Sequence, residues 1–260
     1  MPDNQPATPV PAATIMMLRE RDEGLEVFMV VRHHQIDFAS GALVFPGGKA
    51  DEQDFAEDLA PYLQGAADER DLRAIQVCAI REAFEECGIL LAYEPDGSFI
   101  AGDRLQQLDH YRVPLNNGEI SLLEFLRTER LTLACDSLVH YSHWITPDMM
   151  PKRFDTHFYL AKAPDDHLAI HDGYESVDSV WITPAQAMAD AVSGSRTIIF
   201  PTLKNIEKLA GFGSVADALE FDHKIVPVLP WTEKREDGNY LCIPPEAGYA
   251  GSEIKMPERG

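Results

Sequence analysis

The segment that most constrains this chain is AIREAFEECGIL, residues 79–90. It predicts a helix on which Glu82, Glu85 and Glu86 project together, because residues three and four apart lie on one helix face. Apolar residues flank that face on both sides, which argues against the alternative of a solvated acidic surface, and Gly88 predicts the helix end. A buried carboxylate triplet needs a partner, and carboxylate oxygens are ligands that Mg²⁺ and Mn²⁺ prefer. The segment therefore indicates a divalent-cation site.

A second feature lies upstream, in GALVFPGGKADEQD, residues 41–54. Leu43 to Phe45 predict the end of a strand, and Pro46-Gly47-Gly48 predict a tight turn. Such a turn exposes backbone amides and carbonyls directly after the strand.

Together, FPGGK and REAFEECGI resemble the signature of the Nudix hydrolases. That signature has Gly, five residues, Glu, seven residues, and then Arg-Glu-apolar-x-Glu-Glu-x-Gly-apolar. Its second part matches at every fixed position, which are Arg81, Glu82, Ala83, Glu85, Glu86, Gly88 and Ile89. In the first part Asp54 stands at the Glu position, and residues 55–80 follow it where the signature has seven. A signature split in this way resembles the signature of the Nudix branch that includes peroxisomal coenzyme A diphosphatases and related bacterial hydrolases.

The resemblance implies an α/β Nudix fold, a mixed β-sheet sandwiched between α-helices, as one domain over residues 12–260. We expect insertions at about 55–70 and 101–136 and a helical and hairpin extension from about residue 200. Residues 1–11 are Pro-rich and predict a disordered tail. The first insertion is expected to be a short helix and a loop with a middle free to cover a substrate. Asp71 is then expected to cap the long helix.

Local patterns predict the other elements. Apolar runs predict strands, and helical periodicity predicts helices. The expected segments are strands at 13–19 and 25–33, helical segments at 102–112 and 121–134, and a strand-turn-strand unit at 138–164. Thr183 and Pro184 predict the start of a helix, and Asp237-Gly238 predicts the turn of a final hairpin.

The resemblance also implies metal-dependent hydrolysis of the diphosphate linkage in a nucleoside diphosphate linked to another moiety. Glu82, Glu85 and Glu86 would hold Mg²⁺ or Mn²⁺, with the carbonyl of Gly47 as a further ligand. This cation would neutralise the diphosphate and lower the pKa of the attacking water. Glu85 and Glu86 are also catalytic candidates, since the general base could be a glutamate of the signature.

Other charged residues are further catalytic candidates. Arg81 would orient the loop through a carboxylate, either Asp51 or Asp54. The resemblance implies one more carboxylate from a distant loop, as metal ligand or general base. Glu175 in HDGYES is the first candidate and Asp178 the second, and a solvated loop acid is the alternative for Glu175.

Candidate substrate contacts are Arg153 and Lys49. Arg153, in RFDTHF, could grip a phosphate through two hydrogen bonds, or it could pair with Asp155 or another acid. His157 is expected to pack in its strand rather than to act as a base.

The split signature makes coenzyme A or acyl-coenzyme A the leading substrate class. One alternative is a nucleotide-sugar or dinucleotide diphosphatase. Another is a Nudix-like domain that binds a nucleotide without cleaving it; such domains usually lose signature carboxylates, and this chain keeps all three.

Composition restricts the partners. The net charge of −21 disfavours nucleic acid polymers, which bind through Lys and Arg, and leaves a small diphosphate as the expected substrate. No apolar run approaches the roughly 18 residues that span a bilayer, so no membrane partner is expected. The N-terminus lacks a signal-peptide pattern and the four cysteines lack zinc spacing, which predicts a reduced, cytoplasmic protein. The sequence leaves open whether the chain forms a homodimer.

Overall fold

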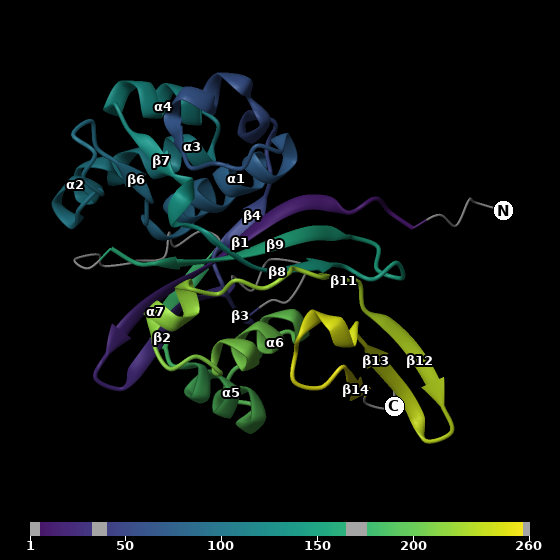
Figure 1. Ribbon diagram of the computed structural model, residues 1–260. Coiled ribbons are helices and arrows are strands. Elements are labelled where there is room, and N and C mark those ends of the chain that lie inside the picture. Colours follow the sequence, from purple (N-terminus) through teal and green to yellow (C-terminus); the bar gives the residue numbers. More distant parts are fainter. Residues whose placement is uncertain (1–5, 33–40, 165–175, 257–260) are drawn as a thin grey trace.

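The computed structural model describes residues 6–32, 41–164 and 176–256 of the chain. Its centre is a mixed sheet with helices on both faces (Figure 1). The long helix α1 (Arg70–Cys87) lies on one face, and three helices cover the other: α5 (Pro184–Ser193), α6 (Phe200–Leu209) and α7 (Val215–Leu219). This arrangement confirms the predicted α/β fold.

The central sheet runs in the order β10-β2-β1-β9-β8-β11, with β3 added beside β2 and β4 beside β1. β1 is parallel to β9 and β8 is parallel to β11, while the other pairs are antiparallel. The strands are β1 (Val10–Arg21), β2 (Gly24–Arg32), β3 (Leu43–Val44), β4 (Gly47–Lys49), β8 (Val139–Ile145), β9 (Phe154–Lys162), β10 (Ser176–Ile182) and β11 (Pro227–Val228).

β1 is the central strand, and both of its faces are buried. Ala13, Ile15 and Met17 belong to the apolar cluster that contains α1, whereas Met16 and Leu18 belong to the cluster on the opposite face. Successive strand side chains point to opposite faces, so a strand covered on both faces needs a continuous apolar run. This explains the sequence ATIMML.

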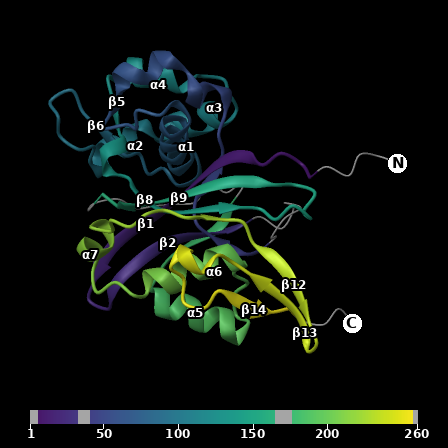
Figure 2. The same ribbon diagram turned by 45° about the vertical axis from the view of Figure 1, so that its right-hand side comes forward.

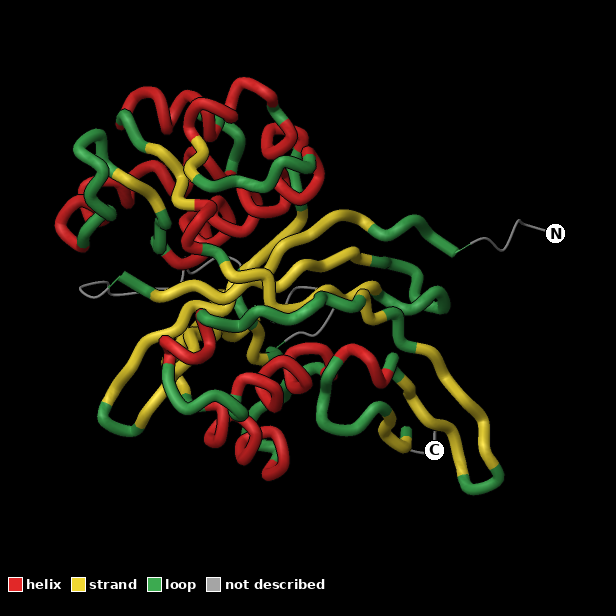
Figure 3. Tube along the Cα trace, in the orientation of Figure 1, coloured by secondary structure: helices red, strands yellow, loops and turns green. Residues whose placement is uncertain are grey.

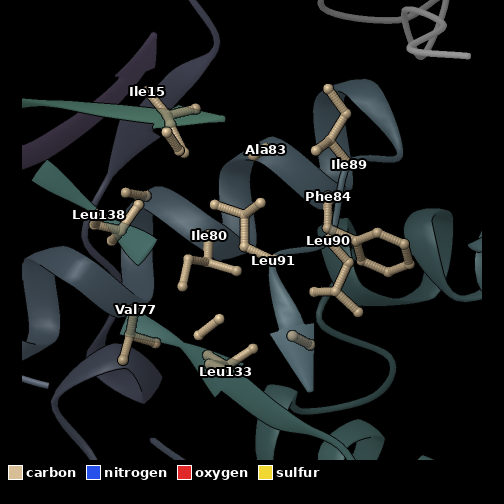
Figure 4. Close-up of a cluster of buried hydrophobic side chains, with 14 of the residues drawn as sticks. Ile15, Val77, Ile80, Ala83, Phe84, Ile89, Leu90, Leu91, Leu133 and Leu138 are labelled. Carbon is tan, nitrogen blue, oxygen red and sulfur yellow. The ribbon is translucent and has the colours of Figure 1, made fainter. Parts of the chain in front are cut away.

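The layer around α1 is built from short elements that all come from residues 52–137 (Figure 2). They are the 3₁₀ turns η1 (Glu52–Phe55), η2 (Glu57–Tyr62), η3 (Asp109–Tyr111) and η4 (Cys135–Ser137), the strands β5 (Leu63–Gln64), β6 (Ala92–Tyr93) and β7 (Thr132–Ala134), and the helices α2 (Gly102–Leu108), α3 (Arg112–Asn116) and α4 (Leu122–Glu129). Val77, Ile80 and Phe84 of α1 point into this layer beside Leu91 and Leu133 (Figure 4). These contacts hold the helix that carries the glutamates.

The predicted C-terminal end of α1 is confirmed, and the predicted N-cap is wrong. Gly88 has a left-handed backbone with φ 69°, and its amide donates to the Phe84 carbonyl, so it ends the helix as predicted. The N-cap is Glu69 and not Asp71. Asp71 lies in the first helical turn, where its negative charge is favourable beside the helix N-terminus.

The opposite face and the C-terminal part contain the remaining elements. The Thr183 hydroxyl accepts a hydrogen bond from the Gln186 amide, which confirms the predicted cap of α5. A separate three-stranded sheet follows (Figure 3), made of β12 (Trp231–Arg235), β13 (Gly238–Cys242) and β14 (Glu253–Lys255), with η5 (Pro245–Ala247) between the last two. Arg235 pairs with Gly238, so the hairpin turn lies at residues 236–237, one position before the predicted turn.

Three other predictions need correction. β1 begins at Val10, whose amide donates to the Arg153 carbonyl, so the predicted tail extends too far. The predicted helix at 121–134 ends at Glu129, since Arg130 is left-handed and residues 132–134 pair with β5 and β6. Residues 55–70 are not free to cover a substrate, because Leu59 is buried and Leu63–Gln64 pair with β7.

No helix in the described ranges has both the length and the apolar character needed to cross a membrane.

Candidate active site

The Gly-Gly turn lies directly beside the carboxylate face of α1. A Cβ on Gly48 would lie 2.5 Å from the carboxylate of Glu82, and a Cβ on Gly47 would lie 2.3 Å from the Ala13 carbonyl oxygen. Gly47 also has φ 153°, which other residues rarely adopt. Both positions therefore require glycine, and Gly48 lets the helix carboxylate rest against the backbone of β4.

The three glutamates of α1 converge at this turn. Glu86 Oε2 accepts a hydrogen bond of 3.0 Å from the Gly47 amide, and Glu82 packs on Gly48. Glu85 and Glu86 are buried, and the side chain of Glu82 is 14% exposed. The predicted burial of the helix is thus confirmed. Two of the glutamates, Glu82 and Glu86, contact the backbone of β4 directly.

Arg81 links the first and second parts of the split signature. Its Nε and Nη2 each donate to an oxygen of Asp54 at 2.9 Å, and both side chains are almost fully buried. Asp51 is 4.0 Å away and exposed, so the structure selects Asp54 from the two predicted partners. Arg81 Nη1 donates to Glu82 and to Glu85, each at 2.9 Å, which orients two of the glutamates.

The charges of this cluster are strongly coupled. Burial opposes the charge of Arg81, but its hydrogen bonds to Asp54 and the charge of Glu82 raise the pKa of the guanidinium further above its ordinary value. Burial raises the pKa of Asp54, although Arg81 opposes this effect. Burial also raises the pKa of Glu85 to about 7, with Glu82 adding to the effect and Arg81 opposing it. Glu85 therefore holds its charge only at a cost.

These features fit a divalent cation. Glu85 Oε1 is buried and has no hydrogen-bond partner among the described residues. A buried acceptor without a partner costs about 1–3 kcal/mol, and a cation bound there would remove that cost. The donor set, three carboxylates beside a backbone turn, is the oxygen-rich kind that suits Mg²⁺ or Mn²⁺.

Arg112 is a positioning residue that the sequence reasoning missed. From α3 it donates to the carbonyl of Glu85 at 3.1 Å and to that of Glu86 at 2.9 Å. These carbonyls belong to the last turn of α1 and have no partner within the helix, so a side chain must satisfy them. No local pattern around Arg112 reveals this contact, because it joins two helices that residues 88–111 separate in the sequence.

The two candidate substrate contacts differ. Arg153 is buried and donates to the carbonyls of Thr146 and Ala7, and it pairs with Asp148 at 2.6 Å. The structure thus favours the structural alternative, with Asp148 instead of Asp155 as the acid. Lys49 is exposed next to Gly48, and its carbonyl accepts from Arg81 at 3.0 Å, so its side chain remains a candidate for a phosphate contact.

The two candidates for the further carboxylate from a distant loop are Glu175 and Asp178. Glu175 lies outside the described residues. Asp178 is exposed on β10, and its Oδ1 accepts from the Ser179 amide. It lies two positions before Val180 and so shares a strand face with it, and Val180 packs in the cluster on the face opposite α1. Asp178 therefore points away from the face that carries the glutamates.

Comparison with known proteins identifies relatives. A family sequence model, NUDT19 Nudix domain, matches residues 67–209, more than half of the chain. An acyl-coenzyme A diphosphatase NUDT19 from Xenopus laevis is 24% identical over 237 residues, covering 75% of this chain and 62% of that protein. The Homo sapiens protein of the same description is 25% identical over 240 residues, with 76% and 64% covered. The chain thus spans less than two thirds of the length of these relatives.

A solved structure is similar over most of the fold. A NUDIX hydrolase from Alicyclobacillus acidocaldarius has a TM-score of 0.70 at 25% identity, covering 83% of this chain and 97% of that one. The similarity confirms the arrangement of the mixed sheet between helices.

Proposed function

The chain belongs to the NUDT19 Nudix domain family, and from this premise we propose that it is a metal-dependent pyrophosphohydrolase acting on coenzyme A or acyl-coenzyme A. The observation that carries the reaction class is the buried Oε1 of Glu85, which has no hydrogen-bond partner in the described part of the chain and lies within a row of three carboxylates. The substrate class is supported by the relatives described as acyl-coenzyme A diphosphatases.

In this proposal, Glu82, Glu85 and Glu86 would hold the cation together with the carbonyl of Gly47. Mg²⁺ or Mn²⁺ would neutralise the diphosphate and lower the pKa of the attacking water. Arg81 fixes two of the carboxylates through hydrogen bonds of 2.9 Å, so the ligands need little rearrangement when the substrate arrives.

The remaining groups act on the substrate and the water. The exposed ammonium of Lys49 contacts a phosphate oxygen. Glu175 accepts a proton from the attacking water. The oxygen of that water bonds to one phosphorus, and the bond from this phosphorus to the bridging oxygen breaks. Hydrolysis of coenzyme A at this bond gives adenosine 3′,5′-bisphosphate and phosphopantetheine, and an acyl-coenzyme A gives the acylated phosphopantetheine.

Two other functions are kept as alternatives. A nucleotide-sugar or dinucleotide diphosphatase would use the same carboxylates on another leaving group. A domain that only binds a nucleotide would not need the buried row of glutamates, and the presence of all three argues for hydrolysis.

The test is a panel of diphosphates incubated with the protein and either Mg²⁺ or Mn²⁺, with products separated by chromatography. We expect coenzyme A and acyl-coenzymes A to give the highest kcat/KM. Faster cleavage of nucleotide sugars or dinucleotides would support the first alternative, and binding without products would support the second. A Glu85→Gln protein prepared in parallel corrects for contaminating hydrolases.

We also propose a cytoplasmic location, supported by four buried free cysteines. We propose a small-molecule diphosphate as the main partner rather than a nucleic acid polymer, because the net charge of −21 disfavours binding to a polyphosphate backbone. Cell fractionation tests the location. The mass of the purified protein in solution tests whether it is a homodimer.

A further inference from the structure

A second group of metal-binding side chains lies on strands β8 and β9, apart from the glutamates. His143 pairs with His157 in the register of the two strands, and Asp155 precedes His157 by two positions. Tyr159, two positions further, belongs to the apolar cluster that contains α1. Since alternate strand residues share a face, Asp155 and His157 also face the α1 side of the sheet.

The three side chains are close enough to share one ion. One donor atom each from His143, Asp155 and His157 lie within 4.8 Å of one another. Nε2 of His143 contacts Oδ1 of Asp155, and the two imidazole rings stack with centroids 4.0 Å apart. Metal–ligand bonds of about 2.0–2.2 Å would require the two stacked rings to tilt toward a shared ion, because an imidazole binds a metal in its ring plane.

A fourth side chain orients this group. Nε2 of His140 lies 3.1 Å from Nδ1 of His157, and the rings of these two residues also pack together. Metal-binding imidazoles usually use one ring nitrogen for the ion and the other for an orienting hydrogen bond. The contact with His140 therefore leaves Nε2 of His157 as the nitrogen for a ligand.

The group borders a cavity of about 290 Å³ between the sheet and the start of α1. Asp155 and His157 form part of its wall, and Phe55, Leu72 and Ile75 provide apolar surface opposite. Glu69 and Asp71, also in the wall, add negative charge that favours a cation. The cavity gives room for an ion and for a water or another ligand bound to it.

We propose that His143, Asp155 and His157 form a binding site for a divalent transition-metal ion, with Zn²⁺ as the best-suited ion and one coordination position open to the cavity. Two imidazoles and one carboxylate match the ligands of three-residue Zn²⁺ sites. Mg²⁺ prefers an all-oxygen environment and is poorly suited to this set. The site therefore differs in metal preference from the glutamate row.

The two sites are also separate in space. Gly48 and His157 both pair with Ala13, on opposite sides of β1. Neighbouring strands are about 4.8 Å apart, so their backbones are separated by about 10 Å. The two groups also have no residue in common.

The experiment is a Co²⁺ titration of the metal-free protein in saturating Mg²⁺, followed by visible absorption and by displacement with Zn²⁺. Saturating Mg²⁺ competes with Co²⁺ for the glutamate row, and four-coordinate Co²⁺ with imidazole ligands gives much more intense visible bands than six-coordinate Co²⁺ with oxygen ligands. We expect one Co²⁺ per chain under these conditions. Zn²⁺ should displace it and should raise the Tm of the protein by mass action.

Variants identify the ligands. His143→Ala and His157→Ala should each weaken Co²⁺ binding by about 100-fold or more, and His140→Ala should weaken it by about 10- to 100-fold as an orienting residue. His223→Ala, at an exposed histidine distant in sequence, should change nothing. Circular dichroism would reveal a histidine variant that fails to fold. Asp155→Asn then serves in its place, because it keeps the shape of a partly exposed side chain.

Absence of Co²⁺ or Zn²⁺ binding in saturating Mg²⁺ would overturn the proposal and leave a hydrogen-bonded histidine–aspartate pair. Equal binding by the wild type, His157→Ala and Asp155→Asn would overturn it as well. Neither result depends on the diphosphatase activity, so failure here is separable from failure of the proposed function.

Discussion

Arg81 and Asp54 meet through two parallel hydrogen bonds of 2.9 Å, although 27 positions separate them in the sequence. The pair closes the gap that the insertion opens in the signature, because it joins η1 to the start of the glutamate row. Asp54 is further fixed by the amide of Asp51, which donates to its Oδ2 at 2.9 Å. One arginine thus anchors the loop and two of the proposed metal ligands.

Removal of Asp54 should destabilise the protein strongly. Asp54→Ala leaves the buried charge of Arg81 without its main partner, and breaking a buried ion pair in this way costs about 3–5 kcal/mol. The free energy of unfolding in urea measures the loss. The matched control is Asp51→Asn, which removes the charge of an exposed acid 4.0 Å from the same guanidinium, keeps the cap of η1 and should cost about 0.5 kcal/mol or less. Similar losses in both variants would contradict the assignment of Asp54 as the anchor.

Glu85→Gln and Glu86→Gln should keep the fold and lower turnover by orders of magnitude. Glutamine preserves the shape of the side chain and can still accept from Arg81 or from the Gly47 amide. It removes the charge that a cation needs, so Mg²⁺ affinity and kcat should fall together. Glu124→Gln, at an exposed position of α4, is the control. Near wild-type activity of either variant at saturating Mg²⁺ would reject the metal assignment.

The stability of the metal-free protein should depend on pH through Glu85. Burial raises its folded-state pKa from 4.5 to about 7, so between these values the folded protein holds a proton that the unfolded chain has released. Stability should therefore decrease as pH rises from about 4.5 to about 7, by about 1–3 kcal/mol relative to Glu85→Gln, which does not titrate there.

The measurement is urea unfolding of both proteins at several pH values, with a chelator and with saturating Mg²⁺. Mg²⁺ should remove the difference between them, since the ion stabilises the ionised carboxylate. A constant difference across this pH range in the chelator would mean that Arg81 keeps Glu85 ionised.

Gly48→Ala should impair the site more than the fold. The added Cβ would lie 2.5 Å from the Glu82 carboxylate, which must then move away from β4. We expect Mg²⁺ affinity to fall by at least about tenfold while the circular dichroism spectrum is retained. Gly213→Ala is the control, because its Cβ would meet only an exposed Asp217 side chain that can rotate. Unchanged Mg²⁺ affinity in Gly48→Ala would show that Glu82 is not a ligand.

The sequence was informative wherever the signal was local. Helical spacing and Gly88 predicted α1 and its end, because both depend on residues a few positions apart. The choice between Asp51 and Asp54 could not be made, since it depends on how η1 folds back onto the helix. The same reason applies to residues 132–134, which pair as a strand only because β5 and β6 lie beside them.

The histidine group shows the limit most clearly. His143 and His157 are 14 positions apart, and their contact depends on the pairing register of β8 with β9, which includes a bulge between His140 and Ser142. A shift by one residue would send these side chains to opposite faces. The pattern Asp-x-His at 155–157 puts two metal-binding side chains on one face, and this was the only local signal.

The late carboxylate gives the last prediction, in which two nearby acids should behave differently. Asp178 is exposed on the β10 face opposite α1, so Asp178→Asn should leave kcat within a few-fold of the wild type. Glu175 is proposed as the general base, a role that contributes about 10²- to 10⁴-fold, so Glu175→Gln should lower kcat by at least about 100-fold. Because a base acts on the proton of the water, excess Mn²⁺ should restore little activity, whereas strong recovery would identify Glu175 as a metal ligand. The kcat values of both variants across a Mn²⁺ titration provide the test. Loss of activity in Asp178→Asn with Glu175→Gln unaffected would reverse the assignment and would require β10 to turn its other face toward the glutamates.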